Sequence, residues 1–79
     1  MRLDKYLKVS RLIKRRTIAN EACDAGKISV NGNTARASYD VKVGDVIAIT
    51  FGGRVTSVKV LAVSETVRAN EASSLYEIV

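Results

Sequence analysis

The first apolar residues of the chain recur with the period of an α-helix. At 100° per residue, a helix over residues 2–9 would place Leu3, Tyr6 and Leu7 on one face, and Ser10 would continue that face. Leu3 and Leu7 form an i,i+4 pair, which is suited to packing against a core. We therefore expect a short amphipathic helix at the start of the chain.

A second helix is predicted after a turn that contains Leu12 and Ile13, both of which would point inward. Thr17 is a suitable N-cap, the helical residues would be 18–25, and Gly26 suits the C′ position that ends a helix. The inward face of this helix would be formed by mostly small side chains: Ile18, Ala19, Ala22, Cys23 and Ala25. Small side chains would let the two helices approach closely.

After the second helix the apolar period changes from 3.6 to 2, which is typical of β-strands. Ile28 and Val30 alternate with polar residues, and Asn31-Gly32 is a strong hairpin signal before a return strand over residues 33–36. Three later segments are predicted as strands: 46–51, 55–63 and 75–79. One helical turn is predicted over residues 64–72. This order predicts an α+β fold, with two N-terminal helices packed on a small, mostly antiparallel β-sheet.

The length of 79 residues is enough for one small domain. We divide it into a helix-loop-helix over residues 2–25, a β-portion over 27–63 and a short C-terminal tail over 64–79. Apolar residues make up 47% of the chain and charged residues 27%, which is a globular composition. A separate catalytic domain therefore has no room.

Residue types exclude several kinds of site. The chain has no histidine and one cysteine, which excludes the common zinc sites, histidine-based triads and disulfide frameworks. Cys23 lies in an alanine-rich helical pattern and should pack as a small hydrophobe. The acids Asp24, Asp40 and Asp45 adjoin turns, with no basic or nucleophilic partner in the pattern. We therefore expect no enzyme activity, metal, cofactor or small-molecule substrate.

The sequence shows no secretory signal and no apolar run of the length that spans a membrane, so we expect a cytoplasmic protein.

Positive charge is concentrated at the start of the chain, although the formal net charge is only +5. Residues 1–16 hold seven basic side chains and one acid, a balance of +6, whereas residues 17–79 hold six basic and seven acidic side chains, a balance of −1. The cations form a stripe on the first helix, opposite its apolar face, and a cluster directly before the second: Arg2, Lys5 and Lys8, then Arg11, Lys14, Arg15 and Arg16.

A polyanion suits such a segment, and a solvated amphipathic helix is the alternative. Four of the seven cations are arginines, whose planar fork suits bidentate contact with phosphate. The N–H groups and dipole at the start of the second helix also favour phosphate. The four aromatic residues are scattered, so we expect recognition of the shape and phosphates of structured RNA, without a stacking platform.

Asp4 is the one acid within the basic segment, and two roles are open for it. In a structural role, it stabilises the first turn of the helix and pairs with Lys8 or a nearby arginine. In a functional role, it orients an arginine toward RNA. Asn20 lies near the same basic face, whereas Asn31 is explained by its turn.

The chain also resembles a known family. The similarity lies within residues 1–51, in the segments "RLDKYL", "SRLIKRRTIANEACDAGKISVNG" and "ASYDVKVGDVI". Their order and spacing resemble the RNA-binding domain named after small-subunit ribosomal protein S-four. The tail "VRANEASSLYEIV" and the length resemble a stand-alone bacterial group, the ribosome-associated quality-control protein P (RqcP) group, which is related to heat-shock protein fifteen.

The resemblance implies an αL-type helix-loop-helix that docks on ribosomal RNA, with the β-portion as its scaffold. It implies binding to obstructed large ribosomal subunits that carry peptidyl-tRNA. There the protein would hold the tRNA in the peptidyl site while a partner factor directs C-terminal alanine tailing of the stalled chain. We expect a ribosome-associated monomer. The candidate RNA-binding residues match the family by position, with Asn20 added from its place near the basic face: Arg2, Asp4, Lys5, Lys8, Arg11, Lys14, Arg15, Arg16, Thr17 and Asn20.

Two departures from the family pattern stand out. Ala37 follows Arg36 where many relatives have a proline, and the tail from Glu65 onward lacks the long basic extension of many heat-shock relatives. The second departure favours the quality-control group. A heat-shock-type recycling factor and a general rRNA- or tRNA-binding module are the nearest alternatives. A protein-interaction module that uses strand 55–63 as an exposed edge, and a duplex-DNA binder, are more distant ones.

Overall fold

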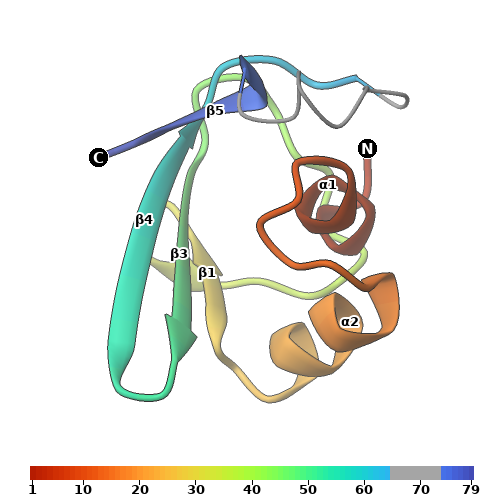
Figure 1. Ribbon diagram of the computed structural model, residues 1–79, viewed down its shortest axis with the longest axis vertical. Helices are drawn as coiled ribbons and strands as arrows, with labels where there is room; N and C mark the ends of the chain where they lie inside the picture. The colour runs from red at the N-terminus through yellow and green to blue at the C-terminus, as the bar shows by residue number, and fades with distance from the viewer. Residues whose placement is uncertain (65–73) are drawn as a thin grey trace.

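Two short helices lie against one face of an antiparallel β-sheet in the computed structural model, which describes residues 1–64 and 74–79 (Figure 1). The elements, in chain order, are α1 (Leu3–Val9), α2 (Arg16–Asp24), β1 (Ile28–Val30), β2 (Asn33–Thr34), β3 (Val46–Phe51), β4 (Arg54–Val60) and β5 (Tyr76–Ile78). The predicted α+β fold is confirmed. Neither of these two helices is long and apolar enough to cross a membrane.

α1 buries the face that its sequence predicts. Leu3, Tyr6 and Leu7 are fully buried, and Ser10, the C-cap, is 1% exposed. The Ser10 hydroxyl donates a hydrogen bond to the Leu7 carbonyl at 3.3 Å. The apolar side of α1 is thus fixed against the core, and its opposite side is available for charged residues.

α2 begins earlier than predicted. Its first helical residue is Arg16, and its N-cap, Arg15, has extended backbone with φ −122° and ψ 132°. Thr17 therefore lies inside the first turn and is not the N-cap. The reason is tertiary, because Arg16 pairs with a carboxylate of α1 from this first turn. The predicted end is confirmed, since Gly26 follows the helix with φ 74°.

The core face of α2 is narrower than predicted. Ala19, Ala22 and Cys23 are buried, whereas Ile18 is 43% exposed and Ala25 is exposed as well. The smallest side chains face α1 because they allow the closest approach, and the larger Ile18 is left at the flank. Cys23 packs as a small hydrophobe, and burial raises the pKa of its thiol to about 11.

The described strands form one antiparallel sheet in the order β2-β1-β3-β4-β5. Ile47 of β3 lies opposite Val30 of β1 on one side and Val58 of β4 on the other. All three side chains are buried. The predicted period of two therefore corresponds to a sheet with one face against the helices (Figure 1).

The Asn31-Gly32 hairpin is confirmed, but its return strand is shorter than predicted. Both turn residues have positive φ, 52° and 85°, as a type I′ turn requires. β2 ends at Thr34, and its pairing with β1 continues through the hydrogen bond from Ala35 N–H to the Ile28 carbonyl at 3.1 Å. The chain leaves the sheet there because the next residues contact α1.

Residues 35–39 form a segment that caps the start of α1. The Tyr39 carbonyl accepts a hydrogen bond from Leu3 N–H at 2.8 Å, and the Ala37 carbonyl accepts one from Asp4 N–H at 3.2 Å. These bonds satisfy N–H groups that the first turn of a helix otherwise leaves without partners. The segment thereby joins α1 to the sheet.

The strand predicted over residues 55–63 ends at Val60, and half of it is not an edge. β5 pairs with its C-terminal half, with Val58 opposite Ile78 and Val60 opposite Tyr76. The edge that the protein-interaction alternative requires is therefore covered over the C-terminal half of the strand. The closing strand predicted over residues 75–79 is confirmed as β5. The helical turn predicted over 64–72 falls, apart from Ser64, outside the described residues.

Tyr6 ties α1 to the C-terminal residues. Its hydroxyl is buried and donates to the Leu75 carbonyl at 2.7 Å, and burial raises the pKa of Tyr6 to about 12. Tyr6→Phe keeps the ring but removes this one hydrogen bond, while the Leu75 carbonyl still accepts from the N–H groups of Leu61 and Ala62 at 2.8 and 3.2 Å. We expect the free energy of unfolding to fall by about 0.5–1.5 kcal/mol, the net contribution of one hydrogen bond, measured by urea denaturation. In the described residues the Tyr76 hydroxyl has no hydrogen-bond partner, so Tyr76→Phe should cost less than about 0.5 kcal/mol. Equal losses would contradict the assignment.

Candidate RNA-binding surface

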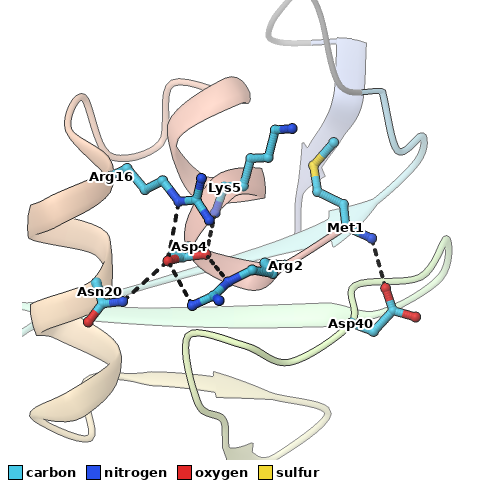
Figure 2. A network of polar contacts seen from close by, with 7 residues as sticks. All are labelled: Met1, Arg2, Asp4, Lys5, Arg16, Asn20 and Asp40. Atoms are coloured by element: carbon cyan, nitrogen blue, oxygen red, sulfur yellow. Dashed lines mark hydrogen bonds and ion pairs between the residues drawn. The ribbon is translucent and has the colours of Figure 1, made fainter.

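A buried carboxylate joins the starts of the two helices (Figure 2). Asp4 of α1 is 2% exposed. Arg2 donates from Nε to Oδ1 at 3.2 Å and from Nη2 to Oδ2 at 3.4 Å. From α2, Arg16 Nε lies 3.3 Å from Oδ2, and Asn20 Nδ2 donates to the same oxygen at 3.3 Å. The Lys5 backbone N–H donates to Oδ1 at 2.8 Å. One acid thus holds donors from both helices.

Asp4 stays ionised in this setting. Desolvation by burial raises the pKa of a carboxyl, but here the hydrogen bonds from Asn20, Arg2, Arg16 and the Lys5 N–H outweigh it. The pKa of Asp4 is therefore below its ordinary value of 3.8. The carboxylate carries its negative charge at neutral pH, and its two arginine partners leave the cluster with one net positive charge.

The two arginines are held by Asp4 and still face solvent. The side chain of Arg2 is 51% exposed and that of Arg16 is 48% exposed, against 3% for Asp4. A guanidinium has five N–H donors, and the contacts to Asp4 use no more than two of them on either arginine. The remaining donors are thus directed outward with reduced rotational freedom, which is the geometry that bidentate phosphate binding uses.

The contacts of Asp4 support the structural role expected for it. It performs the structural role, with the nearby arginines as partners and not Lys8, and by the same contacts it fixes the direction of both guanidinium groups. The contact between Asp4 and Asn20 was not foreseen, because these residues are 16 positions apart and on different helices. No local spacing signals such a pair.

The ten predicted site residues fall into two groups. Five of them form the Asp4 network, with Lys5 contributing its backbone N–H. The others are exposed on the same helix-loop-helix: Lys8, Arg11, Lys14, Arg15 and Thr17. The cluster that follows α1 leads directly into the first turn of α2, and no side chain of the described residues caps that helix. The first-turn N–H groups of α2 therefore lie next in the chain to the cations of the loop.

Arg11 has a left-handed backbone conformation, with φ 63°. It follows the C-cap of α1, where its N–H donates to the Lys8 carbonyl at 3.1 Å and Ile13 N–H donates to the Leu7 carbonyl at 3.0 Å. This position normally favours glycine, because a Cβ in this conformation costs roughly 1–2 kcal/mol. Arg11 therefore places a cation at a position where the backbone conformation alone favours glycine.

Two acids of the β-portion have structural partners. Asp45 accepts hydrogen bonds from Asn31 Nδ2 at 3.1 Å, from the Tyr39 hydroxyl at 2.9 Å and from Lys42 N–H at 3.0 Å. Asp40 pairs with the Met1 amine at 2.7 Å (Figure 2). Asp40 therefore has a basic partner that no side-chain pattern displays, because this partner is the amine of Met1.

Asp4→Asn tests the network. The substitution removes the charge on which two arginines converge, and we expect a loss of about 1–3 kcal/mol in the free energy of unfolding at neutral pH. Because the pKa of Asp4 is lowered in the folded state, this stabilisation is present above pH ~4 and is lost as the pH falls through that lowered value. Urea denaturation at several pH values should therefore show the two proteins converging in acid. A constant difference down to pH ~2 would contradict the ion pairing.

Arg11→Gly tests the backbone strain. We expect the variant to be more stable by about 0.5–1 kcal/mol, since relief of strain exceeds the entropy cost of glycine. Lys8→Gly is the matched control, because it removes an exposed cation of α1 from a helical position and should destabilise by roughly 0.5–1 kcal/mol. Thermal denaturation of both variants measures the difference in sign. A destabilised Arg11→Gly would refute the argument.

Comparison with known proteins identifies the family of this helix-loop-helix. Residues 1–47 match the family described as S4 domain. The chain is 59% identical to the RQC P-site tRNA stabilizing factor of Halalkalibacterium halodurans, over 99% of this chain and 89% of the relative. It is 54% identical to the protein of the same name from Bacillus subtilis, over 99% and 91%.

A solved structure gives the same result for the fold. The trimeric structure of Vibrio cholerae Heat Shock Protein 15 superposes with a TM-score of 0.92 at 32% identity, over all of this chain and 81% of that one. The predicted relationship to both groups is thereby confirmed, and the higher identities lie with the tRNA stabilizing factors. The chain belongs to the S4-domain family of RQC P-site tRNA stabilizing factors.

Proposed function

We propose that this protein acts in ribosome-associated quality control, where it binds obstructed large ribosomal subunits and stabilises the peptidyl-tRNA in the P-site. The observation that carries the proposal is the Asp4 network, which fixes two half-exposed arginines at the junction of the two helices in a chain of this family. The helix-loop-helix is the RNA-binding element, and the sheet is its scaffold.

The physical basis is binding of phosphate by cations whose positions are fixed before the RNA arrives. Arg2 and Arg16 have already lost part of their rotamer entropy to Asp4, so less is lost when they contact RNA. The uncapped N-terminus of α2 adds N–H donors beside them. The exposed cations of the loop supply further phosphate contacts and counterion release. Such a surface recognises the shape and backbone of structured RNA.

Several finer points belong to the same proposal. The protein works beside a partner factor on the same subunit during C-terminal alanine tailing, and it acts as a monomer in the bacterial cytoplasm. Its role is binding, which agrees with relatives named for stabilising a tRNA and not for a reaction.

Similarity to Heat Shock Protein 15 supports a recycling role as the second candidate. Alanine tailing that depends on this protein distinguishes the first role from the second.

Substitution of the two anchored arginines tests the proposal. We expect Arg2→Ala and Arg16→Ala each to weaken binding to large subunits that carry peptidyl-tRNA by about 5- to 30-fold, the equivalent of ~1–2 kcal/mol. The folded state should persist, because the remaining arginine still pairs with Asp4. Co-sedimentation measures binding, and far-UV circular dichroism checks folding.

Lys59→Ala is the control, since it removes one exposed cation from β4 without touching the helix pair. It should bind like the wild-type protein. Full co-sedimentation of both arginine variants would show that the assigned surface is wrong. Association of the wild-type protein with small subunits or free mRNA alone would contradict the proposed function itself.

A further inference from the structure

A groove of about 550 Å³ lies beside the Asp4 network, between α2 and the segment that follows β2. Arg2 and Asn20 line it on the helix side, and Thr34, Arg36 and Ser38 line it on the other. The groove thus borders the Asp4 network on one wall and the segment that follows β2 on the other. None of the residues on its second wall belongs to the predicted binding surface.

The direction of Arg36 is set by its neighbours. Ala35 and Ala37 are buried, at 9% and 6% exposure, whereas Arg36 between them is exposed and begins a turn in which Tyr39 N–H donates to the Arg36 carbonyl at 3.0 Å. The segment is held by backbone bonds at each end, to β1 through Ala35 and to α1 through Ala37. Arg36 is thus a cation on a fixed backbone, next to the start of α1.

The surroundings of Arg36 leave its charge available. Within residues 1–64 and 74–79, the Arg36 side chain has no ion pair or hydrogen bond, in contrast to Arg2 and Arg16. A second groove, of about 410 Å³, lies along the other side of the same segment and shares Thr34, Ala35, Arg36 and Ser38 with the first. Arg36 therefore stands on a ridge between two hollows, without an internal role that would explain it.

We propose that the RNA-binding surface continues over this ridge, and that a single RNA strand lies in the groove with backbone phosphates bound by Arg2 and Arg36. The hydroxyl groups of Thr34 and Ser38, both exposed, supply neutral donors along the same path. This inference rests on the proposed function and adds to it a binding residue outside the helix-loop-helix.

The charged residues that line the groove indicate the path of the RNA strand through it. Two arginines line it, and the one acid of its lining is Asp24, at the last turn of α2. A phosphate is attracted at the Arg2 and Arg36 end and repelled near Asp24. The strand therefore crosses from the network to the ridge and does not follow α2 to its C-terminus. A neutral protein segment would leave Arg2 and Arg36 without anionic partners, whereas successive phosphates of one strand supply them.

Arg36→Gln tests the inference against Lys59→Gln, which removes the same charge from the far strand β4. We expect Arg36→Gln to bind large subunits that carry peptidyl-tRNA about 3- to 10-fold more weakly. The slope of log affinity against log KCl concentration should decrease by about 0.7 to 0.9, the value expected when the protein neutralises one phosphate fewer. Lys59→Gln should leave affinity and slope unchanged.

A tethered probe gives an independent readout. Cys23 is buried with a raised thiol pKa, so an introduced Arg36→Cys can be labelled selectively with an iron chelate that cleaves nearby RNA. We expect cleavage of one contiguous stretch of ribosomal RNA or tRNA from this position, and none in that stretch from Lys59→Cys.

The outcomes separate the two proposals. If Arg36→Gln binds like the wild-type protein with an unchanged salt slope, and Arg36→Cys gives no cleavage while Arg2→Ala still weakens binding, the groove does not hold RNA and the proposed function stands. If the wild-type protein itself fails to bind large subunits, the proposed function fails first. Reduced binding with local cleavage supports the groove.

Discussion

The buried carboxylate of Asp4 is the constraint on which the binding surface depends. A charge that is 2% exposed must be paired, and here its partners come from both helices. The need to satisfy one acid therefore fixes how the start of α2 lies against α1. It also fixes two arginines in solvent-facing positions. Structural stability and the arrangement of cations are thus consequences of the same contact, and neither can change alone.

The sheet extends that constraint to the rest of the chain. α1 is too short to be stable by itself, and its ends are held by residues far along the sequence. The Tyr39 carbonyl binds its first turn, and the Leu75 carbonyl accepts the Tyr6 hydroxyl from its buried face. The β-portion and the tail therefore act as a frame that presents a seven-residue helix, which explains why a nearly neutral β-portion accompanies so basic a segment.

Prediction from the sequence succeeded where the deciding physics is local. The buried face of α1 follows from a period of 3.6, and the Asn31-Gly32 turn follows from positive φ at both positions. It failed where contacts between distant residues decide. Arg16 enters α2 because of Asp4, twelve positions earlier, and β2 stops at Thr34 because the next residues bind α1. Charge and family resemblance were enough to name ten candidate residues. They did not predict which of these residues bind the carboxylate of Asp4.

Two cations, Arg11 and Arg36, occupy positions that do not favour the free protein. A folded chain that gathers seven cations in its first 16 residues bears their mutual repulsion, and a single acid offsets only part of it. Arg11 keeps a cation at a backbone position suited to glycine, and Arg36 keeps one on a ridge without an internal partner among the described residues. Neither choice stabilises the free protein. Both are accounted for under the proposed function, in which an RNA backbone would complete the electrostatic balance and supply a phosphate as the partner of each of these charges.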